Sequence, residues 1–268
     1  MKKSRLDVLL VEKGLVETSS HAQALIMAGK VRVGEQVVTK AGMAVAIDRP
    51  ITVEQPLPYV SRGGLKLAGA LDRFEINPQD LCCADVGAST GGFTDVLLQR
   101  QARRVYAIDV GYGQLAWKLR QDERVTVIER TNARHLSTLP EPIDLVVIDA
   151  SFISLRLILP AVKKWLHQSA QVIALIKPQF EAGKKQVGKG GIVRQRHVHE
   201  QVLQEVAEYA HQQEFVITGL MVSPITGMTG NYEFLIHLGW HTSQTNINLN
   251  QTIEHCLNKI GPLYGTQQ

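Results

Sequence analysis

The sequence contains few cysteines, and their number and placement exclude one broad class of fold. Cys82, Cys83 and Cys256 are the only cysteines among 268 residues. An odd count, with two neighbours on an apolar stretch, argues against a disulfide scaffold and favours reduced thiols in the cytoplasm. Hydrophobic residues make up 44% and charged residues 20% of the chain, which is ordinary for a globular protein that buries a full core.

Long apolar runs are also missing, so no membrane-spanning segment is expected. The most apolar stretch, residues 145–162, contains Asp149 and Arg156, and charges oppose insertion into a bilayer. The apolar residues behind the charged N-terminus, Val8 to Val11, are too few for a signal peptide and are followed by Glu12. The net charge of +4 is compatible with nucleic-acid binding but does not require it.

Two further absences define the glycine-rich stretch from Asp85 to Thr94. Gly87 and Gly92 are spaced as in a phosphate-binding loop, but Phe93 stands where that loop needs a lysine. The dinucleotide pattern, with glycines at relative positions one, three and six, is missing as well. What remains is a carboxylate before an open glycine turn. This suits a ligand with hydroxyls and a positive charge, such as S-adenosylmethionine, better than one with phosphates.

Strands and helices alternate through the larger part of the chain, which predicts an α/β fold with a mostly parallel sheet. The expected strands are 81–86, 105–108, 125–128, 143–148, 172–176, 215–222 and 232–238. The expected helices are 93–98, 155–166, 197–211 and an earlier one capped by Ser61, with Leu67, Leu71 and Phe74 on its apolar face. Four polar residues end successive strands: Asp85, Asp109, Asp149 and Lys177. In such folds that edge of the sheet carries the site.

A separate, compact α+β domain is expected over residues 1–54. It has helices at 4–13 and 20–28 and short strands at 30–33, 36–39 and 51–53. Ser4 and Asp7 resemble a capping box at the start of the first helix. Prolines at positions 56 and 58 predict a semi-rigid linker over residues 55–60.

Two lysines and two acids form a candidate catalytic set: Lys66, Asp149, Lys177 and Glu233. Each stands at the boundary of an apolar element or interrupts one, as Glu233 does between Tyr232 and Phe234. A lysine that is desolvated beside another cation is easier to deprotonate, so Lys177 could accept a proton. A structural network of ion pairs explains the spacing equally well.

Several motifs carry a resemblance to known families. Arg5-Leu6-Asp7-x-x-Leu10, followed by Ala22-x-x-Leu25-Ile26-x-x-Gly29-Lys30-Val31-x-Val33, is similar to the S4 RNA-binding domain. The larger domain resembles the RrmJ/FtsJ-like ribose 2′-O-methyltransferases, which carry a Lys-Asp-Lys-Glu tetrad. With its segments 59–67, 85–94 and 177–181, the whole chain resembles the TlyA family, often labelled haemolysin A.

The resemblance implies a fold, a reaction and partners. It implies a Rossmann-like class I methyltransferase sheet over residues 61–242, after an S4-like domain at 1–54. Residues 243–268 form a C-terminal tail, with a possible packing helix at 247–260. The implied reaction is methyl transfer from S-adenosyl-L-methionine to a ribose 2′-hydroxyl of ribosomal RNA, on a cytidine or another nucleotide. Ribosomal RNA or ribosomal subunits are then the expected partners.

The resemblance also assigns roles to residues. Lys177 is the expected general base, Asp149 steers it, and Lys66 and Glu233 set its charge and position. No metal site is expected. The expected cofactor-binding residues are Asp85, Gly87, Ala88, Ser89, Gly91, Gly92, Phe93, Asp109 and Asn132. The expected RNA-binding residues are Arg5, Lys30, Arg32 and Arg62, together with Lys184, Lys185, Lys189 and Arg194 in a glycine-rich loop that has no acid. A solvated charged surface is the alternative interpretation of both basic groups.

Three other functions remain open. Amino-directed base methyltransferases commonly carry Asn/Asp-Pro-Pro-aromatic after the fourth strand, where this chain has Asp149-Ala150-Ser151-Phe152. Carbon-directed ones need a cysteine nucleophile there, and none is present. An RNA-binding ribosome assembly factor with a cofactor pocket is the second alternative. A membrane-active haemolysin, suggested only by the family label, is the third.

Overall fold

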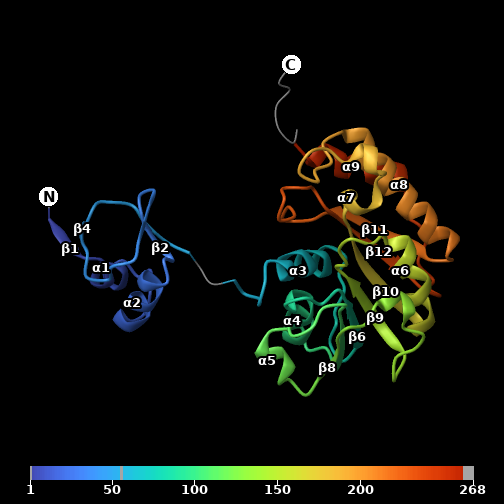
Figure 1. The fold of residues 1–268 in the computed structure, drawn as a ribbon, viewed down its shortest axis with the longest axis horizontal. Helices are drawn as coiled ribbons and strands as arrows, with labels where there is room; N and C mark the ends of the chain where they lie inside the picture. The colour runs from blue at the N-terminus through green and yellow to red at the C-terminus, as the bar shows by residue number, and fades with distance from the viewer. Residues whose placement is uncertain (1, 55–56, 262–268) are drawn as a thin grey trace. The chain divides into compact units, whose positions relative to one another are not determined.

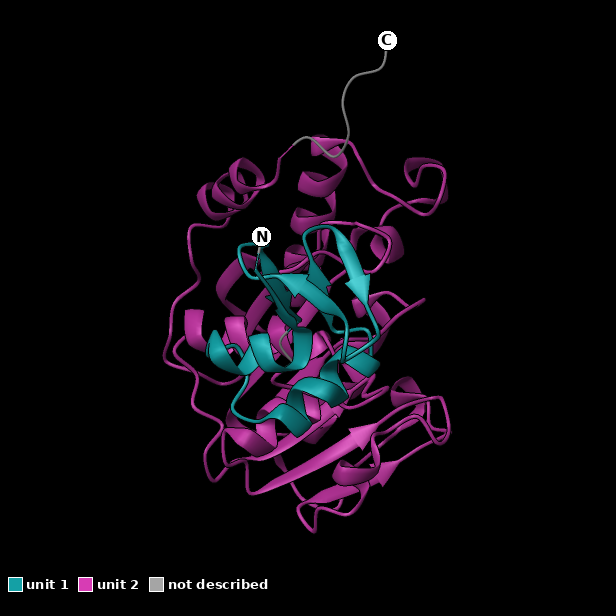
Figure 2. Cartoon of the chain, turned by 90° about the vertical axis from the view of Figure 1, so that its left-hand side faces the viewer, with its two compact units in different colours: residues 1–57 teal, residues 58–268 magenta. Residues whose placement is uncertain are grey.

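The computed structural model describes residues 2–54 and 57–261, and contacts divide the chain into two units, residues 1–57 and 58–268 (Figures 1 and 2). Part of the expected linker, residues 55 and 56, and the last part of the expected tail, residues 262–268, lie outside the described residues.

The first unit combines two helices with two small sheets. Helices α1 (Leu6–Glu12) and α2 (Ser19–Met27) accompany a three-stranded sheet of order β3-β2-β5, formed by Gln36–Val38, Val31–Val33 and Ile51–Val53. A second sheet pairs β1 (Lys3–Arg5) with β4 (Ala44–Ala46). The core of the unit contains Leu6, Leu9, Leu10, Ala22, Ile26, Val31 and Val45. The regularly spaced apolar side chains of the helices and strands therefore pack into one small core.

The start of the first helix differs from the prediction. Ser4 lies in β1, paired with Val45, and Arg5 caps α1 without a side-chain hydrogen bond, so the expected capping box does not form. The Asp7 carboxylate instead accepts hydrogen bonds from the Arg5 guanidinium, at 2.8 and 3.1 Å. Strands β1 and β4 were not expected, because three residues are too few for an alternating pattern to stand out.

The second unit is built on a seven-stranded sheet of order β11-β12-β10-β9-β6-β7-β8. These strands are Val216–Val222, Phe234–Gly239, Leu166–Ile176, Ile143–Ile148, Cys82–Val86, Arg104–Ile108 and Val125–Ile128. From β10 to β8 neighbouring strands are parallel, while β12 is antiparallel to both of its neighbours. The expected mostly parallel α/β sheet is confirmed.

Helices cover both faces of this sheet (Figure 1). The helices are α3 (Gly63–Arg73), α4 (Gly92–Gln99), α5 (Trp117–Arg120), α6 (Leu155–Val162), α7 (Pro178–Glu181), α8 (Arg196–Gln212) and α9 (Leu249–Lys259). Short 3₁₀ turns occupy Ala133–His135, Lys163–Trp165 and Lys184–Gln186. Cys83 and Leu145 pack in one core with α3 and α4, whereas their neighbours Ala84 and Val146 pack in the other with α6 and α8. Alternate residues of each strand thus serve opposite layers.

Several boundaries in this unit also differ from the prediction. Arg62, not Ser61, caps α3, and it does so without a side-chain bond, while the Ser61 carbonyl accepts from the Gly64 N–H at 3.1 Å. Strand β12 begins at Phe234, so Glu233 precedes the strand and does not interrupt it. Helix α6 ends at Val162, two residues after Pro160, and β10 starts earlier than expected, at Leu166. Residues Lys163–Trp165 continue the segment as a 3₁₀ turn, so the expected helix differs mainly in the type of its last turn.

The C-terminal helix joins the second unit. Ile253, Cys256 and Leu257 of α9 are buried in the core that also contains α8 residues. All three cysteines of the chain are buried and free. No helix among residues 2–54 and 57–261 is both long enough and apolar enough to cross a membrane.

Candidate active site

Strand pairing brings the polar strand ends to one edge of the sheet. Val86 pairs with Ile148, and Ile176 pairs with Phe234. The residues next to these positions, Gly87, Asp149, Lys177 and Glu233, therefore lie at the same edge, where β6, β9 and β10 end and β12 begins. Because carboxyl ends of parallel strands meet there, loops from distant parts of the chain form a common site.

Lys177 and Asp149 form the first ion pair of this edge. The Lys177 Nζ atom lies 2.6 Å from Oδ1 of Asp149 and donates a hydrogen bond to the Ser151 hydroxyl at 2.7 Å. The Lys177 side chain is 9% exposed and that of Asp149 is 21% exposed. One segment, the loop after β9, thus supplies both an acid and a hydroxyl to the lysine that follows β10.

Lys66 and Glu233 form the second ion pair. Nζ of Lys66, in the first turns of α3, lies 2.5 Å from Oε2 of Glu233, and both side chains are almost fully buried. The start of α3 also faces Asp149, because a Cβ atom built on Gly63 would lie 3.7 Å from its Oδ2 atom. The structure therefore brings the four residues of the expected catalytic set to one edge as two ion pairs, of which Lys66–Glu233 is almost fully buried and Lys177–Asp149 is partly exposed.

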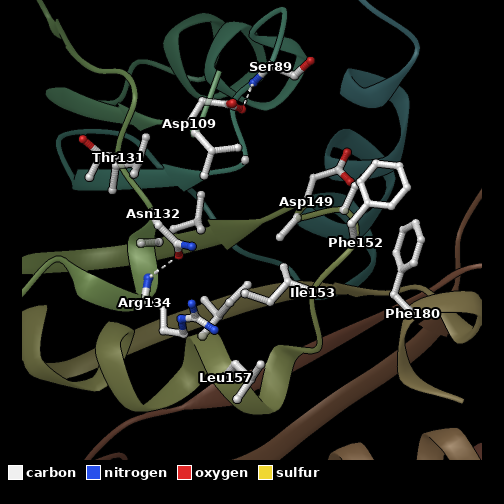
Figure 3. A pocket seen from close by; sticks show the side chains of 18 of the residues that line it. Ser89, Asp109, Thr131, Asn132, Arg134, Asp149, Phe152, Ile153, Leu157 and Phe180 are labelled. Atoms are coloured by element: carbon white, nitrogen blue, oxygen red, sulfur yellow. Dashed lines mark hydrogen bonds between the residues drawn. The ribbon is translucent and has the colours of Figure 1, made fainter. Parts of the chain in front are cut away.

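A cavity of about 930 Å³ opens beside the first pair (Figure 3). Its wall includes Gly87, Ser89, Asp109 and Asn132 from the expected cofactor-binding residues, and Asp149 from the expected catalytic set. It also contains Val110, Gln114, Thr131, Arg134, Ala150, Ile153 and Leu157. The other expected cofactor-binding residues, Asp85, Ala88, Gly91, Gly92 and Phe93, do not line it.

The glycine turn is held open by backbone conformations that suit glycine. Gly87 and Gly91 have φ angles of 85° and 96°, which most side chains disfavour. A Cβ atom on Gly87 would lie 2.7 Å from the Asp149 carbonyl oxygen, so the turn is packed directly against the β9 loop. Glycine at this position keeps the turn and Asp149 together.

Asp109 links two loops at the far side of the cavity (Figure 3). Its carboxylate accepts hydrogen bonds from the Ser89 N–H at 2.8 Å and from the Gly111 N–H at 2.7 Å. Each carboxylate oxygen has two lone pairs, so both can accept a further bond from a ligand hydroxyl.

Asp85 has a different position from the one its place in the glycine-rich stretch suggests. It is fully buried, and its Oδ2 atom accepts from the Thr94 N–H at 2.9 Å and from the Thr94 hydroxyl at 2.6 Å. Its Oδ1 atom is buried without a hydrogen-bond partner. Burial raises the pKa of Asp85 to about 7, against the bonds from Thr94, which lower it. In this structure Asp85 fastens β6 to α4.

Two aromatic residues of the cavity were not among the expected site residues. Phe152 is 89% exposed with a φ of 62°, and its ring lies 4.9 Å from that of Phe180 (Figure 3). Phe180 follows Lys177 closely in sequence, and the Lys177 Nζ atom lies 5.9 Å from its ring centroid. Phe180 stands in a segment that the sequence singled out, whereas an exposed phenylalanine such as Phe152 has no periodic pattern that would reveal it.

Glu181 joins the two loops that carry these groups. Its buried carboxylate accepts from the Ser154 hydroxyl at 2.6 Å and from the Leu155 N–H at 2.7 Å, at the start of α6. Burial raises the pKa of Glu181. The loop with Asp149 and Phe152 is thereby tied to α7, which follows Lys177.

The expected RNA-binding residues fall into two groups. In the first unit, Arg5 pairs with Asp7, Lys30 pairs with Glu54 at 2.9 Å, and Arg32 donates to the Glu35 carbonyl at 3.1 Å. In the second unit, the remaining ones form no ion pair with an acid of the described ranges: Arg62, Lys184, Lys185, Lys189 and Arg194. Over those same ranges, His, Cys, Asp and Glu side chains form no group of three that could hold a metal ion.

Comparisons with known proteins show to which families the two parts of the chain are similar. Residues 59–240 match the FtsJ-like methyltransferase family and residues 4–48 match the S4 domain. The chain is 52% identical over 246 residues to YqxC of Bacillus subtilis, a candidate rRNA methyltransferase, covering 89% of this chain and 86% of that protein. It is 45% identical over 251 residues to the 16S/23S rRNA (cytidine-2'-O)-methyltransferase TlyA of Mycobacterium tuberculosis, covering 91% and 92%. A solved structure of a candidate hemolysin from Streptococcus thermophilus has a TM-score of 0.74 and 44% identity, covering 96% and 95%.

Proposed function

The chain belongs to the FtsJ-like methyltransferase family, and from this we propose that it methylates a ribose 2′-hydroxyl of ribosomal RNA, on a cytidine. The observation that supports the proposal best is the set of two ion pairs, Lys177 with Asp149 and Lys66 with Glu233, at the edge of the sheet beside the cavity. Two lysines held by two acids beside a cavity form a suitable set for moving a proton.

S-adenosyl-L-methionine is the cofactor of this family, and the residues of the cavity fit it. The wall combines apolar side chains, such as Ile153 and Leu157, with the carboxylate of Asp109 and the amide of Asn132. We assign Asp109 to the ribose hydroxyls and Asn132 to the adenine side, with Gly87 and Ser89 forming a further part of the wall. When bound there, the cofactor supplies an electrophilic methyl group on a positively charged sulfur.

The chain's own residues then prepare the RNA hydroxyl. Once its ammonium group has released a proton to solvent, Lys177 would accept the proton of the 2′-hydroxyl at its Nζ atom, while the bound cofactor would supply the methyl group that joins the oxygen. Asp149 and Ser151 hold that nitrogen in place, at 2.6 and 2.7 Å. Lys66 of α3 and Glu233, which precedes β12, add a second, buried charge pair at the same edge of the sheet. Holding the two reactants in line contributes up to roughly 7–11 kcal/mol to such reactions.

The aromatic pair has a role in holding the target nucleotide. A ribose hydroxyl within RNA reaches an enclosed site more easily when its nucleotide leaves the stack. An exposed phenylalanine ring offers such a base a face on which to stack, worth about 1–3 kcal/mol per base. Phe152 lies on the loop that carries Asp149, and Phe180 lies in α7, directly after Lys177, so a base stacked there is close to the proton acceptor.

Methylation of ribosomal RNA with labelled cofactor tests the proposal. Subunits from cells that lack the protein are incubated with purified protein, and the RNA is hydrolysed with alkali, which needs a free 2′-hydroxyl to cleave. Label in an alkali-resistant dinucleotide containing cytidine is the expected result. Label in a mononucleotide would show base methylation, and binding to subunits without any label would favour an assembly factor. Dye release from liposomes without methyl transfer would favour a membrane-active protein. Each of these three outcomes would overturn the proposal.

A further inference from the structure

Asn231 is a fully buried polar residue that the mechanism above does not use. It is 0% exposed, and its side chain satisfies both of its hydrogen-bonding ends. Oδ1 accepts from the Val193 N–H at 2.9 Å, while Nδ2 donates to the Gly191 carbonyl at 2.8 Å and to the Thr229 hydroxyl at 3.0 Å. A buried amide that pairs with the backbone of a distant segment holds that segment at a fixed distance.

The segment held by Asn231 is the basic loop, residues 183–196. Gly188 and Ile192 form a β-bridge at its tip, and Val193, which follows the bridge, is fully buried. Lys189 lies within the bridge and Arg194 follows Val193. The two bonds from Asn231 therefore fix the part of the loop between these two cations.

The turn that contains Asn231 is also packed against the catalytic set. The Asn231 carbonyl accepts from the Gly227 N–H at 2.9 Å, closing a turn over residues 227–231. A Cβ atom on Gly227 would lie 2.5 Å from Oε1 of Glu233, so the turn lies directly on the carboxylate that pairs with Lys66. The Glu233 carbonyl in addition accepts from the Ser223 N–H at 2.8 Å.

We propose that Asn231 is a positioning residue that couples RNA binding at the basic loop to the placement of Glu233 and Lys66. This inference rests on the proposed function. RNA phosphates that contact Lys189 and Arg194 hold the loop, the loop holds Asn231, and the closed turn holds the Glu233 carboxylate against Lys66. These contacts are already formed without RNA, so RNA bound at the loop would stabilise a placement of the second ion pair that the fold provides.

Three single substitutions test the coupling at the basic loop, at the turn on Glu233 and at Asn231 between them. Lys189→Ala removes a phosphate contact and raises KM for RNA severalfold, leaving kcat within twofold. Gly227→Ala pushes on the Glu233 carboxylate and lowers kcat about tenfold, leaving KM for RNA within twofold. Asn231→Asp keeps the acceptor for Val193 but loses both donor contacts, and it changes KM and kcat together, each at least fivefold. Affinity for the cofactor, measured by calorimetry, stays unchanged in all three.

Asn250→Asp is the matched control for Asn231→Asp. It adds the same negative charge to the same unit, but at a residue that is exposed on α9. It is expected to leave both kinetic constants unchanged. If Asn231→Asp altered KM alone, or only the melting temperature, the coupling would be wrong.

Hydrogen exchange gives a readout that does not depend on methyl transfer. In the unmodified protein, adding ribosomal RNA is expected to slow exchange at the Val193, Gly227 and Ser223 amides. In Asn231→Asp, RNA slows exchange in the basic loop but no longer at Gly227 and Ser223. Equal protection in both proteins would overturn the coupling. Absence of methylation in the unmodified protein would overturn the proposed function instead.

A double-variant cycle keeps the inference testable if Asn231→Asp does not fold. Effects on kcat/KM of residues that share no partner are usually additive. The proposal expects Lys189→Ala and Gly227→Ala combined to differ from the product of the single effects by more than threefold. Additive effects would contradict it.

Discussion

Acids and bases cluster at both ends of the parallel strands, and the two clusters differ in burial. At the amino edge, Glu141 pairs with Arg103 at 2.8 Å and with Arg104 at 3.2 Å, and it accepts from the Tyr106 hydroxyl at 3.1 Å. These arginines are 51% and 39% exposed, whereas Lys66 and Lys177 at the carboxyl edge are 10% and 9% exposed.

The comparison shows which feature distinguishes the candidate site. The pairs at both edges consist of a carboxylate and a long cation at hydrogen-bonding distance, so pairing by itself does not mark function. At the amino edge, water can solvate each charge, and such pairs contribute little to stability. At the carboxyl edge, both lysines are nearly buried beside a cavity, and each is held in position by its acid.

Replacing the expected base would have the largest effect. Lys177→Ala removes the proton acceptor, and loss of a general base typically lowers the rate about 10²–10⁴-fold. Methyl transfer to ribosomal RNA should fall by that factor while the affinity for the cofactor stays the same. Radiometric assays and calorimetry measure the two quantities, with the exposed Lys164→Ala as the control. Full activity of Lys177→Ala would mean that the buried lysine at the carboxyl edge of the sheet has no more role in catalysis than the exposed ion pairs at the amino edge.

The same substitution at both edges tests the effect of burial on stability. Glu233→Gln leaves the Lys66 ammonium buried without its counter-charge, which costs roughly 3–5 kcal/mol of unfolding free energy. Glu141→Gln at the amino edge costs about 0–1 kcal/mol, because its partners are exposed. Urea denaturation of both variants measures the difference. Equal losses would mean that the carboxyl edge is not desolvated as its exposed fractions indicate.

The buried Asp85 predicts a dependence of stability on pH. Burial raises its folded-state pKa to about 7, above the ordinary value of 3.8. The folded protein therefore binds more protons than the unfolded chain between these values, and its stability falls as the pH rises from about 4 to about 7. Asp85→Asn cannot lose this proton, so its stability relative to the unmodified protein should increase over that range, by up to about 4 kcal/mol. Urea titrations at pH 4, 5.5 and 7 measure this, and parallel curves for the two proteins would contradict it.

Removing one aromatic ring should have the smallest effect. Phe152→Ala loses a stacking face for the target base and weakens RNA binding by about 1–3 kcal/mol, which appears as a higher KM for RNA. Because Phe152 is exposed, the melting temperature should hardly change. Leu157→Ala, at another exposed apolar position of the same cavity, is the comparison variant. A change in kcat with unchanged KM would assign Phe152 to the chemical step instead.

Most of the fold could be predicted because its signals are local. Apolar runs that end in glycine or a polar residue identified β6, β7, β8 and β9 within one residue at each end. The strands β1 and β4 were missed because each is only three residues long, and Ser4 could not be assigned to a helix or a strand from its neighbours alone. The last turn of the expected helix 155–166 is a 3₁₀ turn, Lys163–Trp165, and apolar periodicity does not distinguish the two helix types at a helix end.

The position of a candidate site residue could be predicted where a charged residue directly follows a strand. Asp109, Asp149 and Lys177 follow this rule, and the register of the sheet brings them to one edge. Asp85 follows it too, but whether an acid faces the cavity or the adjacent helix depends on its rotamer and on Thr94, nine residues away. Glu181 and Asn231 act through contacts with loops that lie far from them in sequence, and no spacing rule reports such contacts.

The burial of all three cysteines has a practical consequence for measuring motion in this protein. Burial raises the pKa of Cys82 to about 12 and that of Cys256 to about 11, and it raises the pKa of Cys83 as well. Because the thiolate is the reactive form, none of the three should react readily with a maleimide dye near neutral pH. Met228, which is 99% exposed in the turn over residues 227–231, offers a place for a single added thiol. Met228→Cys would then accept one fluorophore without any need to remove the native cysteines, and its emission would follow that turn as RNA arrives.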